Sequence, residues 1–177
     1  MAEPAIDEEK LDRVAFKIAR EIQDWTLEIA EEIAERICSY RESQIPRTDR
    51  EGLRSSLAEI IYYSAERKIT PILKKNSLTG YGEDVKAVCI EELKEALYPL
   101  MLEFSGTESP GLVEMALEDG ATKFNLRLEV SLRDLFQDEL DRQAKSRKAA
   151  VRSAAAERIR RRQSRGLLEI IADWFKR

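Results

Sequence analysis

The chain has 177 residues, of which 43% are hydrophobic and 36% charged, and its formal net charge is −4. With only seven glycines and five prolines, this composition is typical of long amphipathic helices around one core, and it excludes a disordered chain. No apolar run reaches the roughly 20 residues that span a bilayer, and the first ten residues are acidic rather than laid out as a secretory signal. We therefore expect a cytoplasmic protein.

The residue types that most catalytic and metal sites require are scarce. There is no histidine, which excludes Ser-His-Asp and HExxH arrangements. Cys38 and Cys89 lie in separate apolar helical stripes, as buried free thiols do, and two distant cysteines are too few for a zinc site. A glycine-rich phosphate loop is missing as well, and the carboxylates near residues 28–35 and 91–95 are typical of solvated helix faces. We expect neither enzymatic activity, nor a metal, nor a cofactor.

Three amphipathic helices are predicted in the first hundred residues. Apolar residues recur at steps of three and four from residue 7 to about residue 41, which indicates one long helix. Thr48 and Glu51 have the spacing of a capping box and predict the start of a second helix, which Pro71 is expected to kink or end. A third helix is expected from Val85 to Phe104.

Residues 124–132 break this helical period, because apolar and polar residues alternate strictly there. Strict alternation predicts a β-strand. An upstream run, 113–117, alternates as well, and Asp119-Gly120 between the two runs is a preferred two-residue hairpin turn. We therefore predict a β-hairpin over about residues 112–130. The competing interpretation is a short helix that begins at Ser109 and Pro110 and ends at Gly120.

A long C-terminal helix is predicted from Ser131 through Arg165, a stretch without glycine or proline. Gly166 is expected to be a hinge or cap before a terminal amphipathic segment, 167–176. Residues 142–177 hold 12 Lys and Arg against three acids, a net charge of +9, which leaves 18 basic and 31 acidic residues, a net of −13, in residues 1–141. The expected architecture is thus a mainly α bundle with a hairpin, divided into an acidic body, 1–141, and a basic helical extension, 142–177.

The arginines of this extension are the strongest functional signal. Four of them, Arg158, Arg161, Arg162 and Arg165, fall within about a quarter of the circumference of a helix. Nine of the 12 basic residues are arginine, whose planar fork suits phosphate. This pattern predicts a binding protein that contacts nucleic-acid backbone without reading its sequence, as part of a nucleoprotein complex. The expected contact residues are Arg147, Arg152, Arg158, Arg160, Arg161, Arg162 and Arg165.

Two other partners fit the same extension. The arginines could pair with an acidic protein surface, including another copy of this chain, so the alternative is a helical adaptor that oligomerises or joins a larger complex. The apolar face of the last segment is expected to dock on protein. Beside a basic run it also suits an anionic membrane surface, which defines a peripheral membrane protein as the second alternative. The expected docking residues are Leu167, Leu168, Ile170, Ile171, Trp174 and Phe175.

Overall fold

The computed structural model describes the backbone of residues 8–40, 47–106 and 108–175; the side chains of residues 8, 47–50, 139, 143, 158, 159 and 161–175 lie outside the description. Within these ranges the chain forms α1 (Glu8–Glu28), α2 (Ala30–Ser39), α3 (Arg47–Lys75), the short 3-10 helix η2 (Thr79–Tyr81), α4 (Gly82–Phe104) and α5 (Pro110–Phe175). The prediction of a mainly helical fold is confirmed.

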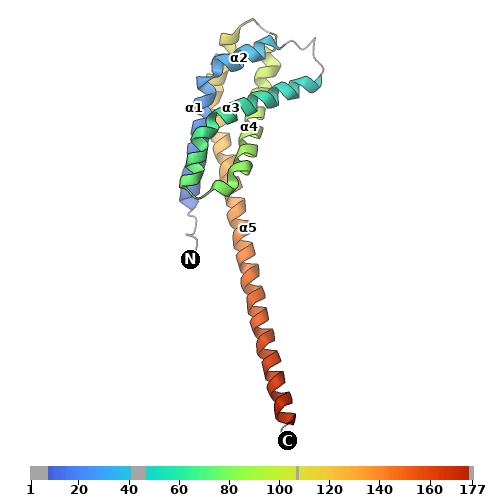
Figure 1. Ribbon diagram of the computed structural model, residues 1–177. Coiled ribbons are helices and arrows are strands. Elements are labelled where there is room, and N and C mark those ends of the chain that lie inside the picture. The colour runs from blue at the N-terminus through green and yellow to red at the C-terminus, as the bar shows by residue number, and fades with distance from the viewer. Residues whose placement is uncertain (1–7, 41–46, 107, 176–177) are drawn as a thin grey trace. The chain divides into compact units, whose positions relative to one another are not determined.

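The chain divides into two compact units, Met1–Phe136 and Gln137–Arg177, so α5 contributes to both. In the first unit α3 packs against α1 and α4, and Figure 1 shows the green C-terminal half of α3 running beside α1. Asn125 of α5 donates to Gln23 of α1 at 2.9 Å. The core of this unit is mainly aliphatic, and its largest fully buried side chains include Ile18, Ile22, Ile33, Ile37, Leu57, Ile61, Ile69, Leu93, Leu97, Leu128 and Phe136.

The predicted β-hairpin over residues 112–130 is wrong. These residues lie inside α5, which begins at Pro110 and continues past Gly120, and no strand occurs in the described ranges. The competing interpretation placed the start of this helix correctly, because the Leu112 amide donates to the Ser109 carbonyl at 3.1 Å in its first turn. It placed the end wrongly, since Gly120 adopts a helical conformation.

The alternating pattern arises because this helix carries apolar residues on two opposite faces. The buried face follows steps of three and four along α5, through Val113, Leu117, Ala121, Phe124, Leu128, Leu132 and Phe136. Leu126 and Val130 belong to the other face and are 59% and 54% exposed. Read in sequence order, Phe124, Leu126 and Leu128 imitate one face of a strand, although Leu126 points away from the core.

The expected single helix over residues 7–41 is interrupted at Ile29. Ile29 has φ −107° and ψ 19°, and it separates α1 from α2. One turn earlier the Thr26 hydroxyl donates to the Ile22 carbonyl at 2.8 Å. Such back-bonding by a threonine side chain bends helices. The bonds from Ile29 to the Trp25 carbonyl and from Ile33 to the Ile29 carbonyl both persist at 3.1 Å, so the interruption is local.

Neither proline ends its helix at once. α3 continues four residues beyond Pro71 to Lys75, and α4 continues five residues beyond Pro99 to Phe104. Proline cannot donate to the carbonyl four residues earlier, which leaves the Arg67 and Glu95 carbonyls without that helical bond. Both prolines lie on exposed positions, where water can satisfy these carbonyls. The predicted capping box of α3 falls on Thr48, whose side chain is outside the described part of the structure.

A Schellman motif closes α3. The Leu78 amide donates to the Leu73 carbonyl at 2.9 Å, and the Ser77 amide donates to the Lys74 carbonyl at 3.2 Å. Ser77 occupies the left-handed position with φ 61°, where glycine is usual. Leu73 and Leu78 are both buried, which supplies the apolar contact that accompanies this motif.

The predicted helix boundaries at Ser131 and Gly166 are also wrong, since both residues lie inside α5. Ser131 caps no helix. Its hydroxyl instead donates to the Glu92 carboxylate of α4 at 2.7 Å. The buried face of α5 crosses this position without a break, through Leu128, Leu132 and Phe136. The Phe136 ring meets the Tyr81 ring edge to face at a centroid distance of 5.9 Å.

Candidate nucleic-acid interface

The second unit presents basic side chains on a continuous helix. Between Asp141 and Glu157 the sequence contains no acidic residue. Lys145, Lys148 and Arg152 are all exposed, and their spacing of three and four residues places them on one face of α5. The face spans roughly 10 Å along the helix axis at 1.5 Å per residue. It offers three cations in a row to a polyanion.

Alanine residues favour the helical conformation of this basic stretch. Ala149, Ala150 and the run 154–156 lie between the basic residues, and alanine is the strongest helix former. Like charges three or four residues apart destabilise a helix by about 0.2–0.5 kcal/mol per pair. Lys145 with Lys148 and Lys148 with Arg152 are two such pairs. A bound anion that neutralises these side chains would remove that repulsion and stabilise the helix further.

The structure describes only some of the predicted contact residues. Arg147, Arg152 and Arg160 are exposed on α5. Four others belong to the same helix, but their side chains lie outside the description: Arg158, Arg161, Arg162 and Arg165. The same holds for the predicted docking residues Leu167, Leu168, Ile170, Ile171, Trp174 and Phe175. Lys145 and Lys148 were not among the predicted contacts, although their helical spacing with Arg152 is visible in the sequence.

Several carboxylates of the first unit pair with cations of the same unit. Glu92 binds Arg127 through the guanidinium of that residue. Arg54 pairs with Glu51 at 2.7 Å and with Glu95 at 3.9 Å, and its guanidinium lies 5.2 Å above the Tyr98 ring. In the described part of the chain no three Cys, Asp or Glu side chains form a group that could hold a metal ion.

Both cysteines are buried thiols that form no disulfide, as predicted. Burial is the main reason that the pKa of the Cys89 thiol lies well above its ordinary value, and the negative charge of Glu92 acts in the same direction. The thiol therefore stays protonated and is a poor nucleophile or metal ligand at neutral pH.

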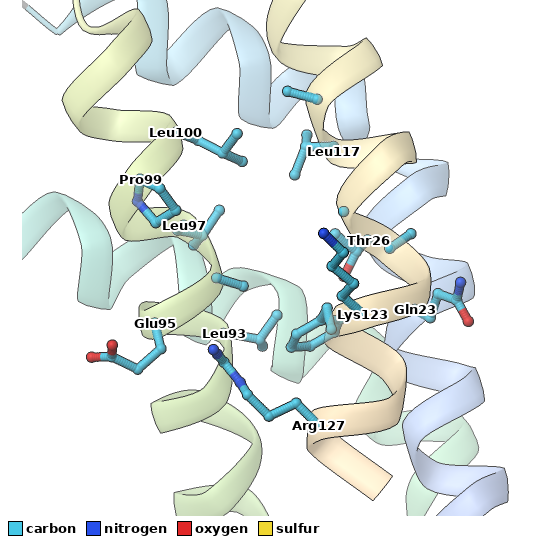
Figure 2. A pocket seen from close by; sticks show the side chains of 15 residues that line it. Gln23, Thr26, Leu93, Glu95, Leu97, Pro99, Leu100, Leu117, Lys123 and Arg127 are labelled. Atoms are coloured by element: carbon cyan, nitrogen blue, oxygen red, sulfur yellow. The ribbon is translucent and has the colours of Figure 1, made fainter.

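Sequence reasoning missed a cavity in the first unit. It has a volume of about 310 Å³ and lies between α1, α4 and α5. Figure 2 shows the side chains around it: Leu97, Leu100 and Pro99 of α4 face Leu117 of α5 across the gap, with Thr26 of α1 beyond them. The sequence does show a series of small residues on α5. They indicate a cavity only once it is known which face of this helix packs against α4.

No helix in the described ranges has an apolar stretch long enough to cross a membrane. Comparisons of the chain with protein-family models, curated proteins and solved structures return no match.

Proposed function

We propose that this chain is a non-enzymatic binding protein that holds nucleic-acid backbone against the basic stretch of α5, as part of a nucleoprotein complex. The observation that carries the proposal is the acid-free stretch 142–156, in which Lys145, Lys148 and Arg152 share one exposed helix face. Its contacts are with phosphate, which positions a protein on nucleic acid without reading the base sequence.

Charge and residue type favour phosphate over an acidic protein surface. Residues 142–177 have a net charge of +9, and nine of their 12 basic residues are arginine. Duplex DNA offers one negative charge per roughly 1.7 Å of axis, so a face about 10 Å long meets several phosphates at once. Arginine also binds phosphate through two parallel hydrogen bonds.

Fluorescence anisotropy of labelled nucleic acid tests the proposal. The full chain is titrated into two unrelated duplexes and two unrelated single strands at several salt concentrations. We expect similar affinities for both sequences of each kind and a linear fall of log K with log salt. Combining Lys145→Ala, Lys148→Ala and Arg152→Ala should reduce the salt slope by roughly two to three, at ~0.7–0.9 per lost phosphate contact.

The matched control changes three arginines of the acidic body. Arg13, Arg20 and Arg36 are exposed and each pairs with an acid one helical turn away, so replacing all three with alanine should leave the slope unchanged. Equal slopes for the wild type and the α5 triple variant would reject the proposal. Competition by polyglutamate at the same charge concentration as DNA would instead identify an acidic protein partner.

Self-association is a second candidate function, favoured by the outer face of α5 in the first unit. Leu112, Met115, Leu126 and Val130 lie within about 60° of the helix circumference, and each is more than half exposed. The midpoint between Leu112 and Val130 is residue 121, and the midpoint between Met115 and Leu126 lies half a residue before it. Antiparallel pairing of two copies would therefore place Leu112 opposite Val130 and Met115 opposite Leu126, a self-complementary arrangement typical of twofold dimers.

Light scattering on the full chain tests this candidate. A dimer should show twice the 20.4 kDa mass of the chain, and combining Met115→Glu with Leu126→Glu should return it to the monomer because each charge would face an apolar partner. Leu102→Glu is the control, since Leu102 is equally exposed but belongs to α4. A monomeric wild type at high concentration would eliminate this function and leave nucleic-acid binding unaffected.

A further inference from the structure

The cavity between α1, α4 and α5 has the character of a ligand site. Its volume of about 310 Å³ lies at the lower end of the range for small-molecule pockets. Protein cores are normally packed without spaces of this size, because the lining atoms lose their dispersion contacts. The walls are mainly apolar and come from all three helices, among them Thr26, Leu93, Leu97, Leu100, Leu117 and Phe124.

Small residues on α5 keep this space open. Ala116, Gly120 and Ala121 are three of the α5 residues that line the cavity. A Cβ added at Gly120 would meet nothing within 4 Å, so neither backbone strain nor a steric clash requires glycine there. Glycine inside a helix lowers helix stability relative to alanine. The residue is therefore unfavourable for the helix and leaves room beside it.

One cation at the rim has no partner in the described part of the chain. Lys123 lies on α5 next to the cavity, and Figure 2 shows its ammonium group directed toward the gap. No ion pair joins it to another described residue. The two other charged residues of the lining are neutralised within the unit, Arg127 by Glu92 and Glu95 by Arg54 at 3.9 Å.

The polar groups on the inner wall are already used. The side-chain amide oxygen of Gln23 accepts from the Asn125 side chain at 2.9 Å, and the Thr26 hydroxyl donates to the Ile22 carbonyl at 2.8 Å. The interior therefore favours an apolar body, and the rim favours a single negative charge.

We propose that this cavity binds a medium-chain fatty carboxylate. Its alkyl chain lies between Leu97 and Leu100 of α4 and Leu117 of α5, where it replaces the missing packing contacts. Its carboxylate lies at the rim against the Lys123 ammonium group, where the charge remains partly solvated. This function is separate from nucleic-acid binding by the second unit.

Isothermal titration calorimetry of the full chain with decanoate, below its micelle-forming concentration, tests the proposal. We expect saturable binding at one site, and Lys123→Gln should weaken it about five- to tenfold through loss of a charge-assisted contact. Decanol should bind more weakly than decanoate by a similar factor. Lys75→Gln is the matched control, because Lys75 is exposed at the end of α3 and should leave the affinity unchanged.

Two variants close the cavity itself. Gly120→Leu and Ala116→Leu each direct a large apolar side chain into the space, and each should abolish decanoate binding while circular dichroism confirms the helical fold. Nucleic-acid binding should be unaffected in both. The proposal is overturned if decanoate does not bind, if decanol binds equally well, or if Lys123→Gln and both leucine variants retain wild-type affinity.

Discussion

Arg127 of α5 binds Glu92 of α4 in two ways, through its Nε to the carboxylate and through its Nη2 to the main-chain carbonyl oxygen at 3.0 Å. Ser131, one helical turn later, donates to the other carboxylate oxygen at 2.7 Å. The Glu92 side chain is only 19% exposed, so it depends on these donors for the solvation it has lost. The three residues join α4 to α5, and Arg127 also lines the cavity.

Arg127→Met should therefore destabilise the protein. We expect a loss of about 1–2 kcal/mol in the free energy of unfolding, since a partly buried carboxylate keeps only the serine as partner. Urea denaturation followed by circular dichroism measures it. Arg20→Met removes a comparable pair on a solvated face, with Asp24 at 3.0 Å, and should cost less than about 0.5 kcal/mol. Equal losses in the two variants would show that the contact between Arg127 and Glu92 stabilises the protein no more than an exposed ion pair does.

Leu128→Ala and Leu126→Ala distinguish the helix from a hairpin. Leu128 is fully buried and Leu126 is 59% exposed, whereas a strand would place both on the same face. Leu128→Ala should lower the free energy of unfolding by about 2–4 kcal/mol, and Leu126→Ala by less than about 0.5 kcal/mol. Similar large losses would favour the strand.

Gly120→Ala should stabilise the protein by about 0.5–1 kcal/mol, because this glycine lies inside a helix with open space at its Cβ position. In a hairpin turn the same change would be destabilising. Gly106 provides the contrast, since its φ of 77° is unfavourable for alanine. Thermal unfolding should show a higher midpoint for Gly120→Ala and a lower one for Gly106→Ala.

Ser77→Gly should also stabilise the protein, by up to about 1 kcal/mol, because Ser77 holds a left-handed conformation that glycine adopts without strain. Ser64→Gly in the interior of α3 is the opposite case and should cost roughly 0.5–1 kcal/mol. Unfolding midpoints in urea compare the two variants, and a destabilised Ser77→Gly would argue against the Schellman closure of α3.

Stability should fall as pH rises above about 9. Burial raises the pKa of Cys89 above its ordinary value of 9.0, and burial likewise raises the pKa of Tyr62 above its ordinary 10.0. Both groups ionise at a lower pH in the unfolded chain than in the folded one. Their contribution to the free energy of unfolding is therefore complete below these ordinary pKa values and is lost as the pH rises above them. Each group can lower the free energy of unfolding by up to about 1.4 kcal/mol for each pH unit in this range.

Unfolding in urea between pH 8 and pH 10.5 measures this dependence. Cys89→Ala should be less stable than the wild type at pH 8, because it leaves a small cavity. Its stability should nevertheless fall less steeply with pH. Parallel curves for the two proteins would show that the thiol does not contribute.

The sequence by itself determined that this protein is mainly helical and that its thiols are buried. The buried residues of α1 and α2 repeat every three to four positions, and a helix is the backbone conformation that gathers such residues on one side. The charge asymmetry of 142–177 is likewise a property of composition. The contact residues Arg147, Arg152 and Arg160 could be named from it, and their exposure agrees with that prediction without testing what they bind.

Tertiary structure decided which side of each helix is buried where both sides carry apolar or aromatic residues. Tyr62 and Tyr63 are neighbours of the same type, yet Tyr62 is buried, and Tyr63 is exposed with the Lys86 ammonium group 4.9 Å from its ring. Along α5 the same ambiguity led to the wrong prediction of a strand, because this helix has two apolar faces. Local pattern cannot resolve this, because burial depends on the helices that pack alongside. The cavity beside Gly120 follows from the same cause, since a small residue leaves a space only where a neighbouring helix encloses it.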